Sequence, residues 1–385
     1  MPFCWNVSLL PQVPLIISDI KIRRLKLIEE IGELVPAWPG NNMTFRRGGG
    51  SFVEITTDED HVGIGPGADP SLLEPAKAQL LGKNPFDIQR HAERLGHYIR
   101  GRGYGGVAGF DIALWDVIGK VTGQPLVSVF GGGDESVIPY ASMIRLSEPR
   151  ERAEMASRLK SEGWRAIKLR IHHDTITEDI ETVQGVRESV GADVTITVDA
   201  NQAQSATDWQ PGIRWDYQRA LQTARELEAL GVAWLEEPLP RYAFDDIARL
   251  NDAVSIPIAG GENNPGLHEF TRMVRENVYD VLQPESMVIG GITATRKVGA
   301  LAEAFHKKCV PHHGGGDIGV IAHLHLVASW PHAPFMELLH DPPIGDYRHK
   351  FSIFKNPPEV TNGTMSVPRG PGLGVEIDPD LVENE

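Results

Sequence analysis

Polar residues recur along the second half of the chain, each at the end of a short apolar run and roughly one strand-plus-helix unit from the next. They are Lys168 with Arg170, Asp199, Glu236, Glu262, Glu285, His312 and Glu337. Their spacing is close to the roughly 30 residues that one strand and its return helix occupy. Because every strand of a parallel barrel ends on the same face, residues spaced in this way converge on one site. The pattern therefore predicts a parallel barrel with a polar site at its mouth.

The apolar runs and the intervals between them predict the order of elements in this barrel. Strands are expected near 137–144, 165–171, 194–199, 232–236, 256–260, 279–283, 308–312 and 334–337. Helices are expected in most intervals, for example at 150–162, 216–230 and 292–306. Regular alternation of strand and helix over this length is typical of an α/β barrel.

The first part of the chain has a different pattern. Alternating runs within 18–60 predict antiparallel strands with a hairpin, and helices are expected near 71–81, 86–99 and 107–123. We therefore predict an N-terminal extension, an α+β domain, a barrel, and a C-terminal segment that packs back onto the α+β domain. Their expected bounds are 1–17, 18–135, 136–340 and 341–385.

Two predicted loops are candidates for determining substrate specificity. Residues 32–50 contain several Pro and Gly residues, and residues 202–215 form a connection longer than a strand-to-helix turn needs. The second is either a tolerated surface insertion or a specificity lid. In the first, Arg46 and Arg47 could hold a distal carboxylate of the substrate, although exposed arginines are also common on any surface.

Composition excludes several classes of partner. A net charge of −15 argues against nucleic acid or an anionic membrane surface as the binding partner. The two cysteines, Cys4 and Cys309, provide no disulfide framework and fit a reducing compartment. The start of the chain lacks a basic leader and is broken by prolines, so no signal peptide is expected. We therefore expect a cytoplasmic protein.

Asp199, Glu236 and Glu262 are the best candidates for metal ligands. Any one of these carboxylates taken alone is more often a surface acid or a helix cap. Three in register at strand ends repel one another unless a cation lies between them. Hard oxygen ligands of this kind suit Mg²⁺, and the same set would also accept Mn²⁺.

Lys168, Arg170, His312 and Glu285 are the candidates for the reaction chemistry. Lys168 and Arg170 lie two apart on one strand, so they share a face, and the apolar residues between and beside them place that face inside the barrel. His312 at a strand end facing a metal is typical of a general base or acid. Glu285 either accepts the imidazole hydrogen and fixes the tautomer of His312, or is a solvated loop acid.

These motifs resemble the enolase superfamily, specifically its mandelate racemase-like branch. The resemblance covers about 18–377. It rests on Lys168-Leu169-Arg170, Val198-Asp199-Ala200-Asn201, Trp234-Leu235-Glu236-Glu237-Pro238, Gly261-Glu262-Asn263, Ile289-Gly290-Gly291, Val310-Pro311-His312, Phe335-Met336-Glu337, the run from Gly109 to Asp116 and the run from Gly370 to Val375.

The resemblance implies a modified TIM barrel, (β/α)₇β, under an N-terminal α+β capping domain, and a homo-oligomer. It also implies that Asp199, Glu236 and Glu262 bind Mg²⁺ while a proton α to a carboxylate is abstracted. Lys168 would then face the substrate carboxylate, Asn201 would contribute to substrate binding, and a protonated Glu337 could donate to the enediolate.

Departures from the family pattern help to distinguish between racemisation, cycloisomerisation and dehydration. Arg170 stands where racemases of the family carry a lysine base, and arginine is a poor base. No lysine follows the sixth strand, as the cycloisomerases would need, and Glu285 replaces the usual aspartate. One-base dehydration of a sugar acid, either an aldonate or an aldarate, remains as the predicted reaction.

Three other functions stay open on the sequence. The first is racemisation or epimerisation of a 2-hydroxy acid, with Arg170 or Lys168 as the second base. The second is a metal-free aldolase that forms a Schiff base on Lys168. The third is a non-catalytic metal-binding or scaffold protein that keeps only the ligands.

Overall fold

Eight parallel strands curl into the sheet that forms the barrel. The structure is a computed structural model that describes residues 15–37, 42–98, 104–206, 209 and 212–384. Within these residues the strand order is β13-β12-β11-β10-β9-β8-β7-β14, so the last strand in sequence pairs with the first. The strands are β7 (Pro139–Ser142), β8 (Ala166–Arg170), β9 (Thr195–Asp199), β10 (Leu235–Glu236), β11 (Ile258–Gly260), β12 (Val281–Leu282), β13 (Lys308–Cys309) and β14 (Met336–Leu339).

Helices surround this sheet because each strand sends apolar side chains outward. Ile167 and Leu169 of β8, for example, are fully buried in the main core, whereas Ala166 belongs to a smaller apolar layer inside the barrel. The helices are α5 (Pro149–Ser161), α6 (Ile176–Val190), α7 (Tyr217–Ala229), α8 (Phe244–Ala253), α9 (Leu267–Arg275), α10 (Ser286–Ile289), α11 (Ile292–Ala304) and α12 (Ile318–Ala328). This arrangement confirms the predicted (β/α)₇β barrel.

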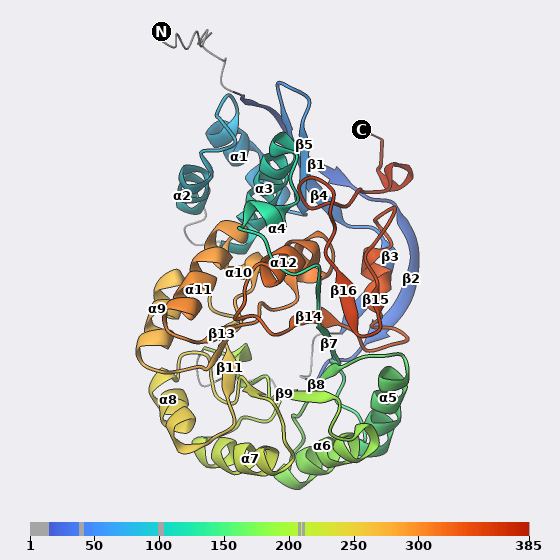
Figure 1. Cartoon of the computed structure of the whole chain (residues 1–385), viewed down its shortest axis with the longest axis vertical. Helices are drawn as coiled ribbons and strands as arrows, with labels where there is room; N and C mark the ends of the chain where they lie inside the picture. The colour runs from blue at the N-terminus through green and yellow to red at the C-terminus, as the bar shows by residue number, and fades with distance from the viewer. Residues whose placement is uncertain (1–14, 38–41, 99–103, 207–208, 210–211, 385) are drawn as a thin grey trace, which may run out of the picture.

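A capping domain of antiparallel strands and helices lies over one side of the barrel (Figure 1). Its sheet has the order β1-β4-β5, built from β1 (Ile17–Arg24), β4 (Ser51–Thr57) and β5 (Val62–Pro66). Its helices are α1 (Leu73–Leu80), α2 (Ile88–Tyr98), α3 (Ala108–Thr122) and α4 (Leu126–Val129). Helix α3 packs so tightly on β5 that a Cβ at Gly65 would lie 2.0 Å from the Gly109 carbonyl oxygen.

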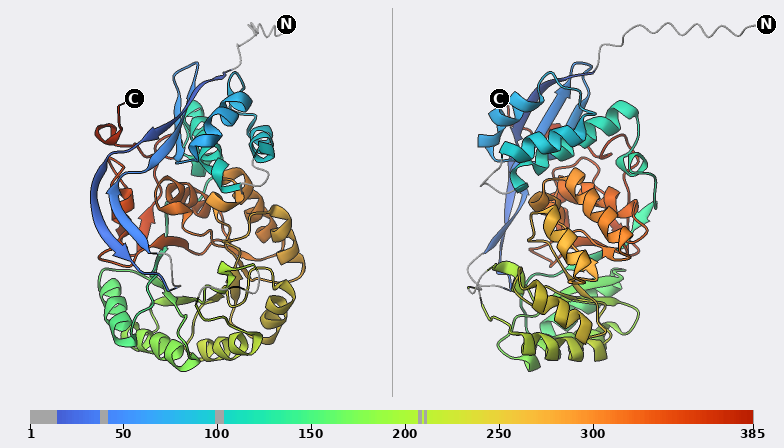
Figure 2. Two further views of the ribbon diagram at one scale, coloured as in Figure 1. Left: turned by 180° about the vertical axis from the view of Figure 1, so that it is seen from behind. Right: turned by 90° about the vertical axis from the view of Figure 1, so that its left-hand side faces the viewer.

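A two-stranded ribbon connects the cap with the mouth of the barrel. Strands β2 (Leu27–Leu34) and β3 (Met43–Gly48) pair antiparallel and curve down beside the barrel (Figures 1 and 2). Leu34 and Phe45 near the tip of the ribbon are buried against Ile144, which lies just past the end of β7. The ribbon therefore carries cap residues to the face where the strands end.

The C-terminal segment returns to the cap. After α13 (Tyr347–Phe351), strands β15 (Val360–Thr361) and β16 (Thr364–Ser366) extend β6 (Ser136–Val137) into a small antiparallel sheet. Further on, the Leu373 backbone N–H donates to the buried Asp116 carboxylate of α3 at 2.7 Å. Short 3₁₀ turns lie at Pro70–Leu72, Tyr104–Val107, Gln202–Gln204, Gly314–Gly316 and Pro379–Leu381.

Two sequence expectations need comment. The predicted loop at 32–50 is wrong at 32–34 and 43–48, which belong to β2 and β3, and 38–41 lie outside the described residues. The 202–215 connection is described only in part, since 207–208 and 210–211 are also outside, as is the N-terminal extension up to residue 14. Within the described ranges, no helix has the length and apolar character needed to cross a membrane.

Candidate active site

The strand ends bring the predicted polar residues together at the mouth of the barrel. Asp199 and Glu236 end β9 and β10, and Glu262 lies two residues beyond β11. Glu337 lies within β14, while Glu285 caps α10 just after β12. All five carboxylates are buried, so their charges are strongly coupled.

Asp199, Glu236 and Glu262 form a compact group of oxygen ligands. One oxygen from each lies within 4.8 Å of the other two. Ligands on opposite sides of a Mg²⁺ ion are about 4.2 Å apart, from bonds of about 2.1 Å each, so a small adjustment would let one ion contact all three. The donor set and its burial therefore fit a divalent cation.

Neighbouring amides hold two of these carboxylates in place. The Asn201 backbone N–H and side-chain amide donate to Asp199 at 2.7 and 3.1 Å. The Gln283 amide donates to Glu236 Oε2 at 2.8 Å. Each carboxylate keeps free lone pairs after these bonds, as a ligand held by outer hydrogen bonds requires.

The electrostatics of the trio also call for a cation. Burial, together with the nearby charge of Asp199, raises the pKa of Glu236 to about 8. Burial likewise raises the pKa of Glu262. In the protein without a metal these acids therefore hold protons at pH values where free carboxyl groups are ionised.

Lys168 is the central cation of the site. Its ammonium lies 2.7 Å from Glu236, 2.8 Å from Glu337 and 3.5 Å from Asp199. Burial alone would lower the pKa of Lys168, but Glu236 and Glu337 raise it above its ordinary value. A lysine held as an ammonium is a poor Schiff-base nucleophile, which disfavours the aldolase alternative.

Glu337 is ionised in this arrangement. Burial opposes ionisation, but Lys168 and His312 hold the pKa of Glu337 well below its usual range. The Tyr140 hydroxyl donates to it at 3.0 Å. These contacts favour a carboxylate that accepts hydrogen bonds, and donation by a protonated Glu337 stays a prediction from the sequence.

Arg170 is directed to a carboxylate of the cluster. Its guanidinium donates to Asp199 Oδ2 at 2.5 Å and lies 3.5 Å from the Ser142 hydroxyl. Only 5% of Arg170 is exposed. This buried ion pair is the placement that an electrostatic clamp requires.

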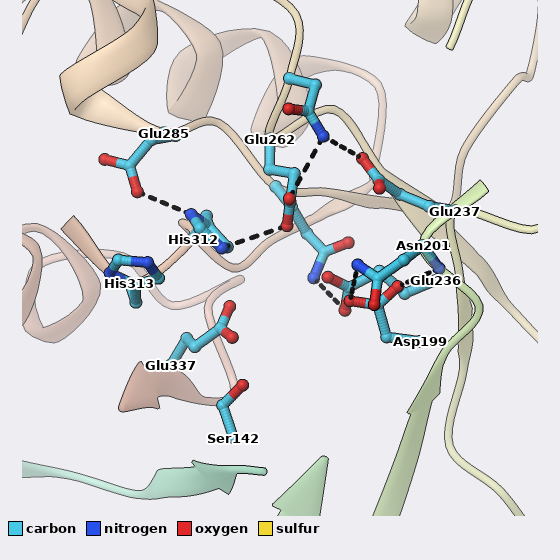
Figure 3. A network of polar contacts seen from close by, with 12 residues as sticks. Ser142, Asp199, Asn201, Glu236, Glu237, Glu262, Glu285, His312, His313 and Glu337 are labelled. Carbon is cyan, nitrogen blue, oxygen red and sulfur yellow. Dashed lines mark hydrogen bonds and ion pairs between the residues drawn. The ribbon is translucent and has the colours of Figure 1, made fainter. Parts of the chain in front are cut away.

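His312 and Glu285 form a dyad beside the carboxylate trio. The Nδ1 atom of His312 lies 2.8 Å from Glu285, and its Nε2 atom lies 3.2 Å from Glu262 (Figure 3). The Glu285 carboxylate also accepts the backbone N–H groups of Met287 and Gly314, both at 2.9 Å. These bonds fix the carboxylate, which in turn fixes the orientation of the imidazole.

The charges of the dyad support proton transfer by His312. Burial lowers the pKa of His312, but Glu262, Glu337 and Glu285 outweigh this and raise it to about 10. For Glu285 burial is offset by the hydrogen bond to His312, and its pKa falls to about 2. An imidazolium facing a fixed carboxylate is the arrangement expected of a histidine that stores a proton.

The sequence patterns did not predict several buried residues of the site. Gln283 and Tyr140 are polar residues within otherwise apolar strand regions. A polar residue in such a region could have indicated a place in the site. His323 of α12 is 1% exposed, and its pKa, lowered mainly by burial, is also influenced by Glu285 and the His312 backbone. Nothing in the apolar pattern of α12 could have placed His323 behind the dyad.

Arg46 and Arg47 are not brought into the cluster. Arg46 lies 3.4 Å from Glu30 and Arg47 lies 2.9 Å from Glu29, across the exposed surface of the β2–β3 ribbon. These cations already have carboxylate partners in the cap. The predicted contact with a distal substrate group is therefore not seen in their placement.

Known proteins are similar to this chain over most of its length. Residues 150–381 match the family described as enolase C-terminal domain-like. The chain is 34% identical over 347 residues to arabinonate dehydratase of Saccharolobus solfataricus, covering 86% of this chain and 88% of that protein. It is 30% identical over 369 residues to D-galactarolactone cycloisomerase of Agrobacterium fabrum, covering 89% and 92%. A solved structure of D-glucarate dehydratase from Agrobacterium tumefaciens, complexed with magnesium, matches with a TM-score of 0.81 at 26% identity, covering 96% of this chain and 99% of that one.

Proposed function

This chain belongs to the enolase superfamily, in its mandelate racemase-like branch, and from that membership we propose that it is a Mg²⁺-dependent dehydratase of a sugar acid. The observation that carries the proposal is the histidine–carboxylate dyad of His312 with Glu285, which lies next to the three-carboxylate cluster. A dyad on one side of the substrate supports a one-base reaction.

In the proposed reaction the neutral form of His312 takes the proton α to the substrate carboxylate on Nε2. Glu262 is the charge that most raises the pKa of His312, so a divalent ion that offset the Glu262 charge would favour this neutral form. Lys168 would bind that carboxylate through its ammonium, and Nδ1 of His312 stays hydrogen-bonded to Glu285. A divalent ion held by Asp199, Glu236 and Glu262 would supply positive charge that stabilises the doubly negative deprotonated acid.

The resulting imidazolium then donates this proton to the departing β-hydroxyl, which leaves as water. The C–O bond breaks as the electron pair of the former C–H bond forms the new double bond. The resulting enol rearranges to a 2-keto-3-deoxy acid, so atoms and charge balance with one histidine acting as base and then acid.

The position of Arg170 weighs against the racemase alternative. Two-base racemisation needs a neutral base on the face opposite His312, whereas Arg170 is protonated and bound to Asp199. Lys168 is held as an ammonium by two carboxylates. Cytoplasmic location, use of Mn²⁺ and a homo-oligomeric state stay predictions from the sequence.

The experiment is a turnover screen of the Mg²⁺-loaded protein with a panel of aldonates and aldarates, monitored for 2-keto-3-deoxy acid. We expect product from at least one acid, and the His312→Asn variant should lose turnover by about 10²–10⁴-fold while still binding Mg²⁺. Absence of keto acid from the whole panel would contradict the proposal. Deuterium from solvent entering recovered substrate without loss of water would support a racemase or epimerase instead.

A further inference from the structure

A small cavity adjoins the reacting dyad. It has a volume of about 100 Å³. It lies where the loop after β13 and the end of β14 meet the β2–β3 ribbon and α13. His313, whose ring centroid is 4.2 Å from that of His312, forms part of its wall. Leu339, two residues past Glu337 on β14, forms another part. Sites for whole ligands are about 300–1,000 Å³, so this cavity suits one end of a substrate whose other end reacts.

The wall of the cavity is mainly apolar but includes one permanent cation, Lys350. Met43, Phe45, Val320 and Leu338 supply much of the apolar surface. The aliphatic stem of Lys350 packs over Gly316, whose Cβ position would lie 3.5–3.8 Å from the Lys350 side-chain carbons. Gly316 adopts a φ of +101°, a backbone conformation that residues other than glycine rarely tolerate.

Lys350 has no carboxylate partner. In the part of the chain that the structure describes, no acidic oxygen lies within ion-pair distance of its ammonium, although the side chain is partly buried. The partly buried Asp317 is influenced by the Lys350 charge but lies beyond ion-pair distance of the ammonium, and its carboxylate accepts the Ile318 backbone N–H at 2.6 Å. A partly buried ammonium without a counter-ion favours an anionic ligand.

His313 adds a hydrogen-bond donor to the same wall. Its Nδ1 accepts the Gly315 backbone N–H at 3.1 Å, so the proton of a neutral ring resides on Nε2. Burial and the adjacent His312 lower the pKa of His313 to about 4, which keeps the ring neutral near pH 7. The cavity thus offers an ammonium and an N–H donor, and both suit an acceptor such as a carboxylate.

We propose that Lys350 binds the second carboxylate of a dicarboxylic sugar acid, so that aldarates are the preferred substrate class over aldonates. The inference rests on the proposed dehydratase function and assigns the distal role expected of Arg46 and Arg47 to a residue of the C-terminal segment. The reacting carboxylate would lie at Lys168, and the far carboxylate would reach Lys350 beside His313.

The test compares stereochemically matched pairs, D-glucarate with D-gluconate and galactarate with D-galactonate. Steady-state constants would be measured for the Mg²⁺-loaded wild type, Lys350→Met and Lys350→Arg. Lys355→Met is the matched control, because Lys355 follows α13 on the surface and pairs with Glu376 at 3.4 Å.

We expect the wild type to prefer the aldarates. The Lys350→Met variant should lower kcat/KM on aldarates by about 10–100-fold, mainly through KM, because one charge-assisted contact is lost. Turnover of aldonates should not change, Lys350→Arg should retain most of the preference, and Lys355→Met should behave as the wild type. A wild-type preference for aldonates, or an equal loss on both classes in Lys350→Met, would overturn the inference.

A failure of the proposed function is distinguishable from a failure of this inference. If no acid of the panel is dehydrated, the dehydratase proposal fails, and calorimetric binding of D-glucarate and D-gluconate to the Mg²⁺-loaded protein replaces turnover as the readout. Tighter binding of D-glucarate that weakens selectively in Lys350→Met would still support the distal subsite. Equal binding of the two acids would overturn it.

Discussion

At the scale of single residues, the site is a balance of buried charge. Lys168, Arg170 and a protonated His312 offset three of five neighbouring carboxylates. Those carboxylates are Asp199, Glu236, Glu262, Glu285 and Glu337. The two negative charges that remain equal the charge of one divalent cation, and without it protons must occupy the site.

Mg²⁺ should therefore stabilise the protein more at pH 8 than at pH 6. The folded-state pKa of Glu236 is about 8 against an ordinary 4.5, so the metal-free protein loses stability as pH rises through that window. His312, at about 10 against 6.5, loses its stabilising contribution between those values. A metal ion competes with these protons, and its binding strengthens as they leave.

Thermal melts with and without Mg²⁺ at the two pH values measure this effect. Glu262→Gln is the control, because it removes one ligand and should abolish the Mg²⁺ shift in Tm at both pH values. An Mg²⁺ shift in wild-type Tm that is equal at pH 6 and pH 8 would contradict the charge balance described above.

The Glu285→Gln variant should change the pH dependence of turnover as well as its rate. Glu285 helps to raise the pKa of His312, so its loss lowers that pKa and moves the acidic limb of kcat/KM to lower pH. Loss of this orienting carboxylate should also reduce kcat by about 10–100-fold. Glu188→Gln on the surface of α6 is the control, and an acidic limb that stays in place would refute the role of Glu285.

At the scale of elements, the cap supplies the missing N-terminal cap of a barrel helix. Helix α11 begins after Gly291 without a side-chain cap of its own. Asp111 of α3 accepts the Thr293 backbone N–H at 2.9 Å, and the Trp115 indole donates to the Thr293 hydroxyl at 2.9 Å. A Cβ at Gly291 would lie 2.4 Å from the Asp111 carboxylate, so only glycine permits this approach.

Replacement of Asp111 by alanine should lower the free energy of unfolding by about 1–3 kcal/mol, because a buried N–H donor loses its acceptor. Urea unfolding measures the change. Asp245→Ala is the matched control, since Asp245 lies in the first turn of α8 with its side chain 93% exposed, and it should change stability by about 0.5 kcal/mol or less. Similar losses in the two variants would show that Asp111 is not a cap for α11.

The same scale shows which elements could be predicted. The strand ends of the barrel were predictable because an apolar run followed by an acid fixes both the end of the strand and the direction of the side chain. The β2–β3 ribbon was not predictable, because the Gly and Pro residues in this stretch are typical of a loop. Its strands are stabilised by pairing with each other and by packing on Ile144, and neither contact can be read from local sequence. For Arg46 and Arg47, strand parity alone could not tell which face of the ribbon meets the barrel.

Lys350 illustrates a further limit of sequence-based reasoning. It lies far along the chain from the strand-end motifs, in a short helix of a segment with no repeating pattern. Only the return of that segment to the mouth of the barrel places Lys350 beside His313. The catalytic cluster followed from local periodicity, whereas the distal cavity depends on long-range packing.

At the scale of the whole molecule, the cap, the barrel and the C-terminal segment share one apolar core. A single cluster of buried side chains includes Val53 of the cap, Leu169 of the barrel and Leu373 of the C-terminal segment. Because these parts bury apolar surface against a common core, we expect them to unfold together in one transition.

The Leu373→Ala variant tests this cooperativity, because Leu373 is fully buried and lies outside both the barrel and the cap sequence. The substitution should lower the free energy of unfolding of the whole protein by about 2–5 kcal/mol, with an unchanged dependence on urea. Tryptophan fluorescence and far-UV circular dichroism should report the same midpoint, while Leu81→Ala at a 39% exposed position should shift it little. If the C-terminal segment were only a local clasp, Leu373→Ala would instead separate an early transition from an unshifted main one, since a locally detached segment leaves the remaining core intact.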